Sequence, residues 1–249
     1  KLDPGNAGER NHSVFPSLAK MKGGFFMLKN LFDFFFVTDA ESGSFYPTTA
    51  GNIALLIVIA LLFVALLALS KGNKKINVKQ IAFSAVAMTM AVVTSIYTVY
   101  EFPFGGSITL FRMFFICFIG YLYGTKAGII TGVAYGILDF ILKPYAITII
   151  QPLLDYPIAF GCLGLSGLFS KSKYGIIKGY IVGVAGRYIC HVLTGVIYFH
   201  EYAGGKNPLI YSLTYNASYI VPEAVLTVLL LLIPAVRQGL TEVKKMALE

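Results

Sequence analysis

The stretch GNIALLIVIALLFVALLALS (Gly51–Ser70) places this chain in a membrane, because none of its residues carries a charge. A helix needs about 20 mostly apolar residues to cross a bilayer. Of the 249 residues, 57 % are hydrophobic and 13 % are charged, and the mean hydropathy is +0.74. A soluble domain carries about 25 % charged residues, so the composition excludes an ordinary water-soluble globule.

Six further apolar stretches follow the first one and are joined by short connections rich in Gly, Pro and Lys. They are Gln80–Tyr100, Ile108–Tyr123, Lys126–Leu142, Gln151–Ser170, Gly175–Phe199 and Ile210–Val236. The first stretch lacks any group that could bind a polar ligand, and a Lys-rich linker follows it. We therefore expect an all-α membrane protein, a six-helix bundle over residues 76–240 with one extra N-terminal transmembrane helix in residues 51–75.

The two ends of the chain differ from this bundle. Residues 1–20 are polar and do not begin with Met, so we expect a disordered segment left by an expression vector. Within residues 21–50, the aromatic stretch Phe25–Phe36 is too short to span and predicts a helix lying on the membrane surface. Residues 241–249 are expected to form a cytoplasmic tail.

The basic residues indicate how the spans are oriented. The chain has 20 Lys and Arg against 12 Asp and Glu, a formal net charge of +8. The connections after the first, third, fifth and seventh spans hold Lys71, Lys74, Lys75, Lys79, Lys126, Lys171, Lys173, Lys178, Arg237, Lys244 and Lys245. The other connections hold only Lys143 and Lys206. Cytoplasmic loops carry the excess of Lys and Arg, so we expect a cytoplasmic C-terminus and an extracellular N-terminus in a cell membrane, without a nucleic-acid partner.

Ionisable side chains within the spans are candidates for a binding site, since they are costly at membrane depth. Asp155 lies near the start of the fifth span, directly before Tyr156 and Pro157. It is either an interfacial carboxylate that caps a helix or, as we favour, the acceptor for an amino group or cation of a ligand.

Polar residues in the last two spans fall at a similar depth. His191 is followed at i+4 by Gly195, which leaves backbone open to a flat ligand, although a buried core His would fit as well. Tyr211 belongs to a Tyr stripe that could be an interface belt, whereas Asn216 can turn inward. Together with Asp155, these residues predict a pocket for a polar heterocycle in the outer half of the membrane.

The remaining charged residues within the spans are less favoured as ligand contacts. Glu223 is expected to pair with Arg187 or Arg112, and Arg187 is placed in the inner half of the sixth span, far from Asp155. Arg112 can approach the pocket. Asp139 lies near the outer end of its span, where a solvated carboxylate is as compatible with the sequence as a ligand contact.

Sequence motifs for catalysis are absent. No phosphate-binding loop, zinc-binding spacing or serine nucleophile motif occurs. The three cysteines lie singly in apolar runs, as small buried residues do. We therefore expect no enzyme activity, no cofactor and no metal site, and uphill transport would need energy from a partner.

Small residues recur at helical spacing in two of the spans, where they allow close helix approach in lipid. Gly128, Gly132 and Gly136 are expected to pack inside the bundle. The alanines of the second span suit either internal packing or docking of another membrane subunit; they are Ala82, Ala85, Ala87 and Ala91.

Five stretches together resemble the thiamine-specific substrate-binding subunits (S components) of bacterial energy-coupling factor (ECF) vitamin transporters. They are GGSITL (Gly105–Leu110), YGTKAGIITGVAYGILDFIL (Tyr123–Leu142), QPLLDYPIAFGCLGLSGLF (Gln151–Phe169), RYICHVLTGVIYF (Arg187–Phe199) and YSLTYNASYIVPE (Tyr211–Glu223). The resemblance covers about residues 76–240.

This resemblance implies a six-helix subunit that captures thiamine from outside and topples in the bilayer to release it inward. Its partners would be a transmembrane coupling protein and two cytoplasmic ATPases. By matching position, Asp155 and Tyr156 would contact the aminopyrimidine, and the Gly105–Ser107 loop would be an extracellular lid. The other implied ligand contacts are hydrogen bonds from His191, Tyr211 and Asn216 and ring walls from Tyr135, Tyr145 and Phe199.

The chain departs from the family pattern in three places. Tyr135 and Phe199 stand where members usually have Trp, and Val86 occupies an expected Ala position on the docking helix. Arg112 falls where small or acidic residues are more common, and a cation there does not suit a thiazolium. An S component for another heterocycle, such as a thiamine precursor, and a standalone channel or facilitator are the alternatives.

Overall fold

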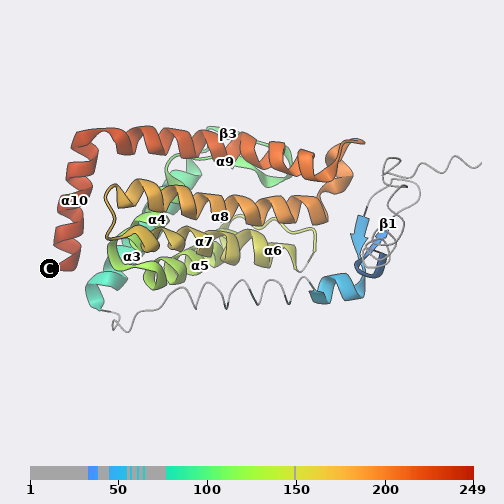
Figure 1. The fold of residues 1–249 in the computed structure, drawn as a ribbon, viewed down its shortest axis with the longest axis horizontal. Coiled ribbons are helices and arrows are strands. Elements are labelled where there is room, and N and C mark those ends of the chain that lie inside the picture. The colour runs from blue at the N-terminus through green and yellow to red at the C-terminus, as the bar shows by residue number, and fades with distance from the viewer. Residues whose placement is uncertain are drawn as a thin grey trace, which may run out of the picture.

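The computed structural model describes residues 33–38, 45–54, 57, 61, 64, 77–148 and 150–249. Across these residues the chain runs up and down through a bundle of helices (Figure 1). Within the described residues, five helical segments are long and apolar enough to cross a membrane, and α4 is a shorter apolar helix.

The six apolar stretches predicted between residues 76 and 240 are confirmed as the helices of this bundle. Five of them form α3 (Val78–Ile96), α4 (Arg112–Tyr123), α5 (Thr125–Leu142), α8 (Gly175–Tyr198) and α9 (Pro208–Leu232). The remaining one is broken into α6 (Gln151–Leu153), η2 (Leu154–Ile158), α7 (Ala159–Cys162) and η3 (Leu163–Phe169).

Two helix ends differ from the prediction for identifiable reasons. α4 begins only at Arg112, because Phe111 takes a left-handed conformation with φ of 61°. The residues before it form β3 (Tyr100–Glu101) and β4 (Ser107–Ile108), an antiparallel pair joined through η1 (Pro103–Gly105). α9 ends at Leu232, shortly before Pro234, which starts a new helix as proline at a first helical position often does.

That new helix is α10 (Pro234–Leu248), so residues 241–249, expected as a tail, are almost entirely helical. α10 lies across one end of the bundle (Figure 1). Hydrogen bonds hold it there: Lys244 Nζ donates to Ser170 O at 2.5 Å, Tyr123 Oη to Ala247 O at 3.2 Å and Lys79 Nζ to Met246 O at 3.4 Å.

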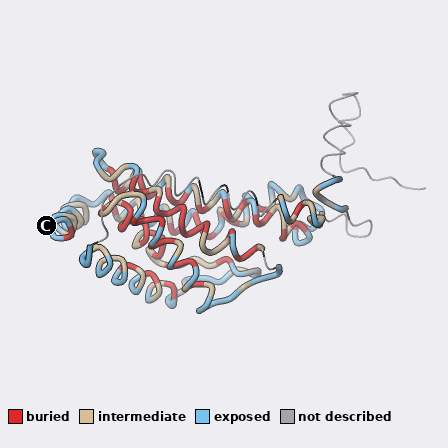
Figure 2. The backbone as a smooth tube through the Cα atoms, turned by 90° about the horizontal axis from the view of Figure 1, so that it is seen from below, coloured by how far each residue is buried: buried red, intermediate tan, exposed pale blue. Residues whose placement is uncertain are grey.

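Glycines of α5 let it pack directly against the α6–η3 segment. A Cβ added to Gly132 would lie 2.2 Å from Phe160 O, and one added to Gly136 would lie 2.5 Å from Tyr156 O. The internal packing predicted for these glycines is therefore confirmed. Buried residues concentrate along the inside of the bundle (Figure 2), and Tyr135 and Tyr180 are among the largest fully buried side chains.

Parts of the N-terminal region are described. β1 (Phe36–Thr38) and β2 (Phe45–Pro47) form an antiparallel pair, so Phe36 lies in a strand where a surface helix was predicted. Residues 49–54 are helical, which includes the start of the first predicted span. Residues 33–35 of the predicted surface helix are helical. Most of the first span, the segment 1–20 and residues 25–32 of the predicted surface helix lie outside the described residues.

Candidate functional site

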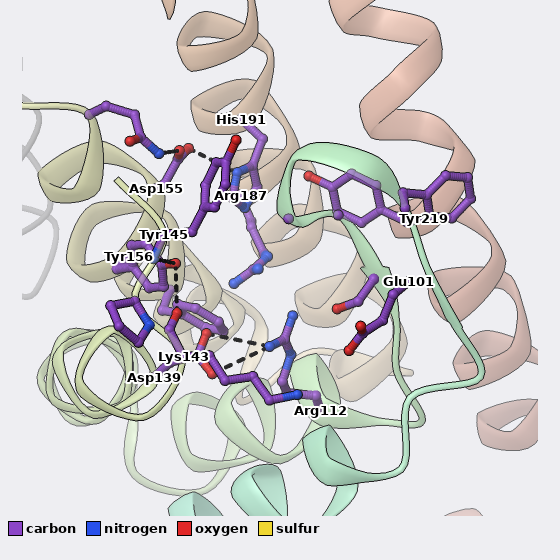
Figure 3. A pocket seen from close by; sticks show the side chains of 17 residues that line it. Glu101, Arg112, Asp139, Lys143, Tyr145, Asp155, Tyr156, Arg187, His191 and Tyr219 are labelled. Atoms are coloured by element: carbon purple, nitrogen blue, oxygen red, sulfur yellow. Dashed lines mark hydrogen bonds and ion pairs between the residues drawn. The ribbon is translucent and has the colours of Figure 1, made fainter. Parts of the chain in front are cut away.

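A cavity of about 370 Å³ lies at the end of the bundle away from α10, and we call it the main cavity (Figure 3). The β3–β4 hairpin, the first residue of α4, the end of α5, η2, α8 and α9 all contribute to its lining. Its lining residues are Glu101, Phe102, Gly105, Gly106, Ser107, Arg112, Asp139, Lys143, Pro144, Tyr145, Gln151, Asp155, Tyr156, Phe160, Arg187, His191 and Tyr219.

Asp155 is held in this cavity by partners on both carboxylate oxygens. One oxygen lies 3.0 Å from His191 Nδ1, and the other accepts a hydrogen bond of 2.6 Å from Gln151 Nε2. Asp155 stands on η2, a π-helical turn that contains Pro157. Wide turns of this kind recur at functional sites, and this turn aims a restrained carboxylate at the cavity.

His191 presents its second ring nitrogen without a partner. Nδ1 is occupied by Asp155, whereas Nε2 is buried and has no hydrogen bond among the described residues. A buried polar atom without a partner costs free energy. A ligand that hydrogen-bonds to Nε2 would remove this cost.

A side cavity of about 40 Å³ adjoins the main cavity and shares Asp155, His191 and Tyr219 with it. Its other lining residues are Thr194, Gly195, Phe199, Tyr211, Ser212, Tyr215 and Asn216. The structure thus brings Asp155, His191, Tyr211 and Asn216 together around one side cavity, with Gly195 and Phe199 beside them.

Asn216 and Gly195 also take part in the packing of the helices. Asn216 Nδ2 donates to Ser212 O at 2.9 Å, and its Oδ1 accepts from Tyr219 Oη at 2.6 Å. A Cβ on Gly195 would lie 2.1 Å from Ser212 Oγ. Asn216 Nδ2 also donates to His191 O on α8 at 3.2 Å. Both residues therefore set the close approach of α8 and α9 beside the side cavity.

Aromatic side chains wall the cavities near their mouth. The rings of Tyr145 and Phe199 stack with their centroids 6.1 Å apart. Tyr156 Oη donates to Lys143 O at 3.1 Å and accepts from Tyr145 N at 3.2 Å, which ties the loop after α5 to η2. Tyr135 lies outside both linings: it is fully buried and donates to Ala91 O at 3.3 Å.

The Gly105–Ser107 loop, expected as a lid, covers part of the main cavity. Gly106 N donates to Tyr215 Oη at 3.2 Å, and that hydroxyl donates to Pro103 O. The loop is therefore fixed to α9 by this tyrosine in the structure.

The remaining intramembrane charges are arranged differently from the prediction. Arg187 lines the main cavity with Asp155, because it lies one turn before His191 on α8. Glu223 makes no ion pair with either arginine; it accepts from Thr109 Oγ1 at 2.7 Å and from Met113 N at 3.0 Å. These two partners satisfy its carboxylate at the start of α4.

Asp139 is buried rather than solvated, and it pairs with Arg112 at 3.4 Å. Both side chains are about one-tenth exposed. Sequence reasoning had not joined these two residues, since they come from different helices. It also missed Gln151, although its spacing of four residues from Asp155 on a helix was a signal.

The alanines of α3 point to two different sides. Ala87 and Ala91 are buried within the bundle, whereas Ala82 and Ala85 are exposed. Only the latter pair is available to another membrane subunit in this structure.

A membrane helix bundle that encloses a polar cavity with aromatic walls defines a membrane protein that binds a small polar ligand. A family model identifies the family: residues 81–242 match the thiamine transporter protein family, and the chain belongs to it. The extra N-terminal segment precedes the matched region.

Individual relatives agree with this membership. The chain is 31 % identical over 179 residues to the thiamine transporter ThiT of Bacillus subtilis, covering 66 % of this chain and 92 % of the relative. It is 35 % identical over 115 residues to ThiT of Lacticaseibacillus paracasei, covering 39 % of this chain and 57 % of the relative. A solved structure of ThiT from Listeria monocytogenes shares the fold with a TM-score of 0.53 at 23 % identity, covering 63 % of this chain and 96 % of that one.

Proposed function

We propose that this protein is the thiamine-binding subunit of an ECF-type importer and is not itself an enzyme. The observation that carries the proposal is Asp155, held by Gln151 and His191 in the cavity of a chain that belongs to the thiamine transporter protein family. The cavity of about 370 Å³ has a size typical of small-molecule sites.

The chemistry of thiamine suits this cavity. Its aminopyrimidine can donate from the amino group to Asp155 and accept or donate at His191 Nε2, which has no other partner among the described residues. Its positively charged thiazolium would be attracted by the faces of the aromatic walls. The proposed ligand contacts are Asp155, Tyr156, His191, Tyr211, Asn216, Tyr145, Phe199 and Gly195, whereas the buried Tyr135, which lines neither cavity, is left out.

The positions of the charges support uptake from outside. The cavity opens at the end of the bundle away from α10, where the described connections carry only Lys143 and Lys206. The end with α10 holds Lys79, Lys126, Lys171, Lys173, Lys178, Arg237, Lys244 and Lys245. The excess of basic residues favours a cytoplasmic position for α10 and the C-terminus, so the cavity would face outward.

Release to the inside would then depend on partners. We propose a transmembrane coupling protein, contacting α3 near the exposed Ala82 and Ala85, and two ATPase subunits that supply the energy. Toppling of the bundle in the bilayer would carry the bound vitamin across.

Two measurements test this proposal. In equilibrium binding with the purified protein in detergent, thiamine should saturate the protein, and its separate pyrimidine and thiazole precursors should bind more weakly. Tighter binding of a precursor would identify the alternative heterocycle. In liposomes, the protein alone should show no sustained thiamine flux, and fast unsaturable flux would instead indicate a channel.

A further inference from the structure

An apolar groove of about 380 Å³ lies between α8 and α9 and shares no lining residue with the main cavity. Only Tyr, Ile, Val, Ala and Leu side chains line it, from residues 180–188 of α8 and 220–229 of α9. Nine helical residues extend over about 12 Å, which is most of one leaflet, since the hydrocarbon core of a bilayer is about 30 Å thick. We call this feature the α8–α9 groove.

The packing of α8 explains why the groove opens in the half of the bundle nearer α10. At the cavity end, α8 and α9 approach closely, because a Cβ on Gly195 would lie 2.1 Å from Ser212 Oγ. Nearer α10, a Cβ on Gly179 would lie 2.4 Å from Ser166 O, so this part of α8 packs closely against η3. Its other side, toward α9, is lined by the groove residues.

Two cations flank an aromatic ring at the α10 end of the groove. The guanidinium carbon of Arg237 lies 5.1 Å from the centroid of the Tyr174 ring, and Lys173 Nζ lies 5.6 Å from it. Tyr174 directly precedes α8, and Arg237 lies in the first turn of α10, which follows α9. In Figure 1, α10 crosses the bundle at this end of α8 and α9. Arg237, Lys173 and Tyr174, which we call the basic cluster, therefore join the ends of the two helices that form the groove.

The positive charge of the basic cluster has no counterpart in the described part of the chain. Neither Arg237 nor Lys173 forms an ion pair with a described residue, and Arg237 Nε is buried without a hydrogen bond there. Glu242 of α10 already pairs with Lys245 at 2.8 Å. A buried donor without a partner costs free energy, and guanidinium and ammonium groups both bind phosphate. The basic cluster is therefore suited to an anionic phosphate group.

We propose that the α8–α9 groove and the basic cluster together bind one anionic phospholipid. Its acyl chain lies in the groove, and its phosphate contacts Arg237 and Lys173. Basic sites between transmembrane helices bind anionic headgroups in this way, and tyrosine is enriched at the level of the headgroups. The apolar and charged parts of the site follow each other in the order that a lipid has in the bilayer, with the charge at the membrane surface.

A lipid titration of the full-length protein in non-ionic detergent tests the proposal. Because a ligand of the folded state raises the melting temperature, we expect dioleoyl-phosphatidylglycerol to raise it saturably. Dioleoyl-phosphatidylcholine should need a concentration at least about 10-fold higher for half of the effect. Equal effects of the two lipids would overturn the proposal. A saturable effect of glycerol 3-phosphate would overturn it as well, because it would indicate a site for free phosphate esters.

Charge variants assign the effect to the basic cluster. Arg237→Gln/Lys173→Gln should raise the half-saturating concentration of phosphatidylglycerol about 10-fold or more. Lys126→Gln/Lys206→Gln is the matched control, because it removes two exposed cations outside the groove and the basic cluster. This control should leave the concentration unchanged, and an equal effect of both double variants would contradict the proposal.

A variant that fills the groove tests the acyl part independently, and it decides alone if Arg237→Gln/Lys173→Gln does not melt cooperatively. Ala185 is exposed and lines the groove, so Ala185→Phe should raise the half-saturating concentration about 5-fold or more. Ile189→Phe places the same ring one turn further along α8, outside the groove, and should have no effect. Unchanged binding in Ala185→Phe would overturn the proposal.

The lipid site is independent of the proposed function. None of the substituted residues lines either cavity, so thiamine should bind all of these variants as it binds the unaltered protein. Failure of the unaltered protein to bind thiamine would contradict the proposed function alone, whereas the lipid titrations decide on the α8–α9 groove.

Discussion

The carboxylate of Asp155 is held in an orientation in which it can accept a hydrogen bond from a ligand. Its two carboxylate oxygens are engaged by His191 at 3.0 Å and by Gln151 at 2.6 Å, and its side chain is 12 % exposed. A carboxylate fixed in this way needs no reorientation to accept a hydrogen bond from a ligand amino group, which reduces the entropic cost of binding.

Replacing Asp155 by Asn should therefore weaken thiamine binding strongly. Truncating one partner of a buried charged hydrogen bond costs about 2–5 kcal/mol, so we expect a loss of affinity of at least about 30-fold. Glu242→Gln is the matched control, because Glu242 is an exposed carboxylate on α10 outside both cavities. Equal affinity of Asp155→Asn and the unaltered protein would remove this residue from the site.

The Arg112–Asp139 pair predicts an effect on stability. Removing one partner of a buried ion pair is destabilising by about 3–5 kcal/mol, so Asp139→Asn should lower the apparent melting temperature in detergent by about 5 °C or more. In Arg112→Leu/Asp139→Leu no charge is left unpaired, and part of this loss should be recovered. A double variant less stable than Asp139→Asn would contradict this account.

At the scale of residues, the sequence alone can single out candidates where the chemistry is local. Asp155, His191 and Asn216 stood out because polar groups are rare in apolar spans, and the structure gathers them around adjoining cavities. The pairing of Arg112 with Asp139 depends on how α4 and α5 pack, which spacing along the chain does not specify.

At the scale of elements, the glycines of α5 determine how closely it approaches the α6–η3 segment. Gly132→Ala would place a Cβ 2.2 Å from the backbone oxygen of Phe160, which a side-chain rotation cannot relieve. We expect a loss of stability of about 1–3 kcal/mol, seen as a lower melting temperature in detergent.

Gly239→Ala provides the comparison for this variant. Gly239 is helical in α10, and a Cβ added there meets no atom within 4 Å. Alanine favours a helix over glycine by up to about 1 kcal/mol, so Gly239→Ala should leave stability equal or higher. Equal melting temperatures for Gly132→Ala and the unaltered protein would contradict the close packing.

Hydropathy predicted the helices well but predicted their ends less well. Long apolar runs specify a span, whereas the start of α4 depends on the left-handed backbone of Phe111, a conformation with no strong sequence signal for an aromatic residue. The predicted last span Ile210–Val236 ran through Pro234, although a proline at this position is a signal for the observed break between α9 and α10.

At the scale of the whole molecule, the orientation of the bundle links the cavity to uptake. Lys206 and Lys173 are exposed residues in connections at opposite ends of the bundle, and the native cysteines Cys117, Cys162 and Cys190 are buried. In intact cells, a membrane-impermeant maleimide should label Lys206→Cys, and Lys173→Cys only after lysis. The reverse pattern would place the cavity on the cytoplasmic side.

We expect this chain to bind thiamine by itself, without its partners, in the cavity around Asp155. A calorimetric titration of the purified full-length protein in detergent tests it most directly. We predict saturable binding of one thiamine per chain, with most of the affinity lost in Asp155→Asn. Absence of saturable binding by correctly folded protein would show that this chain does not bind thiamine in this cavity.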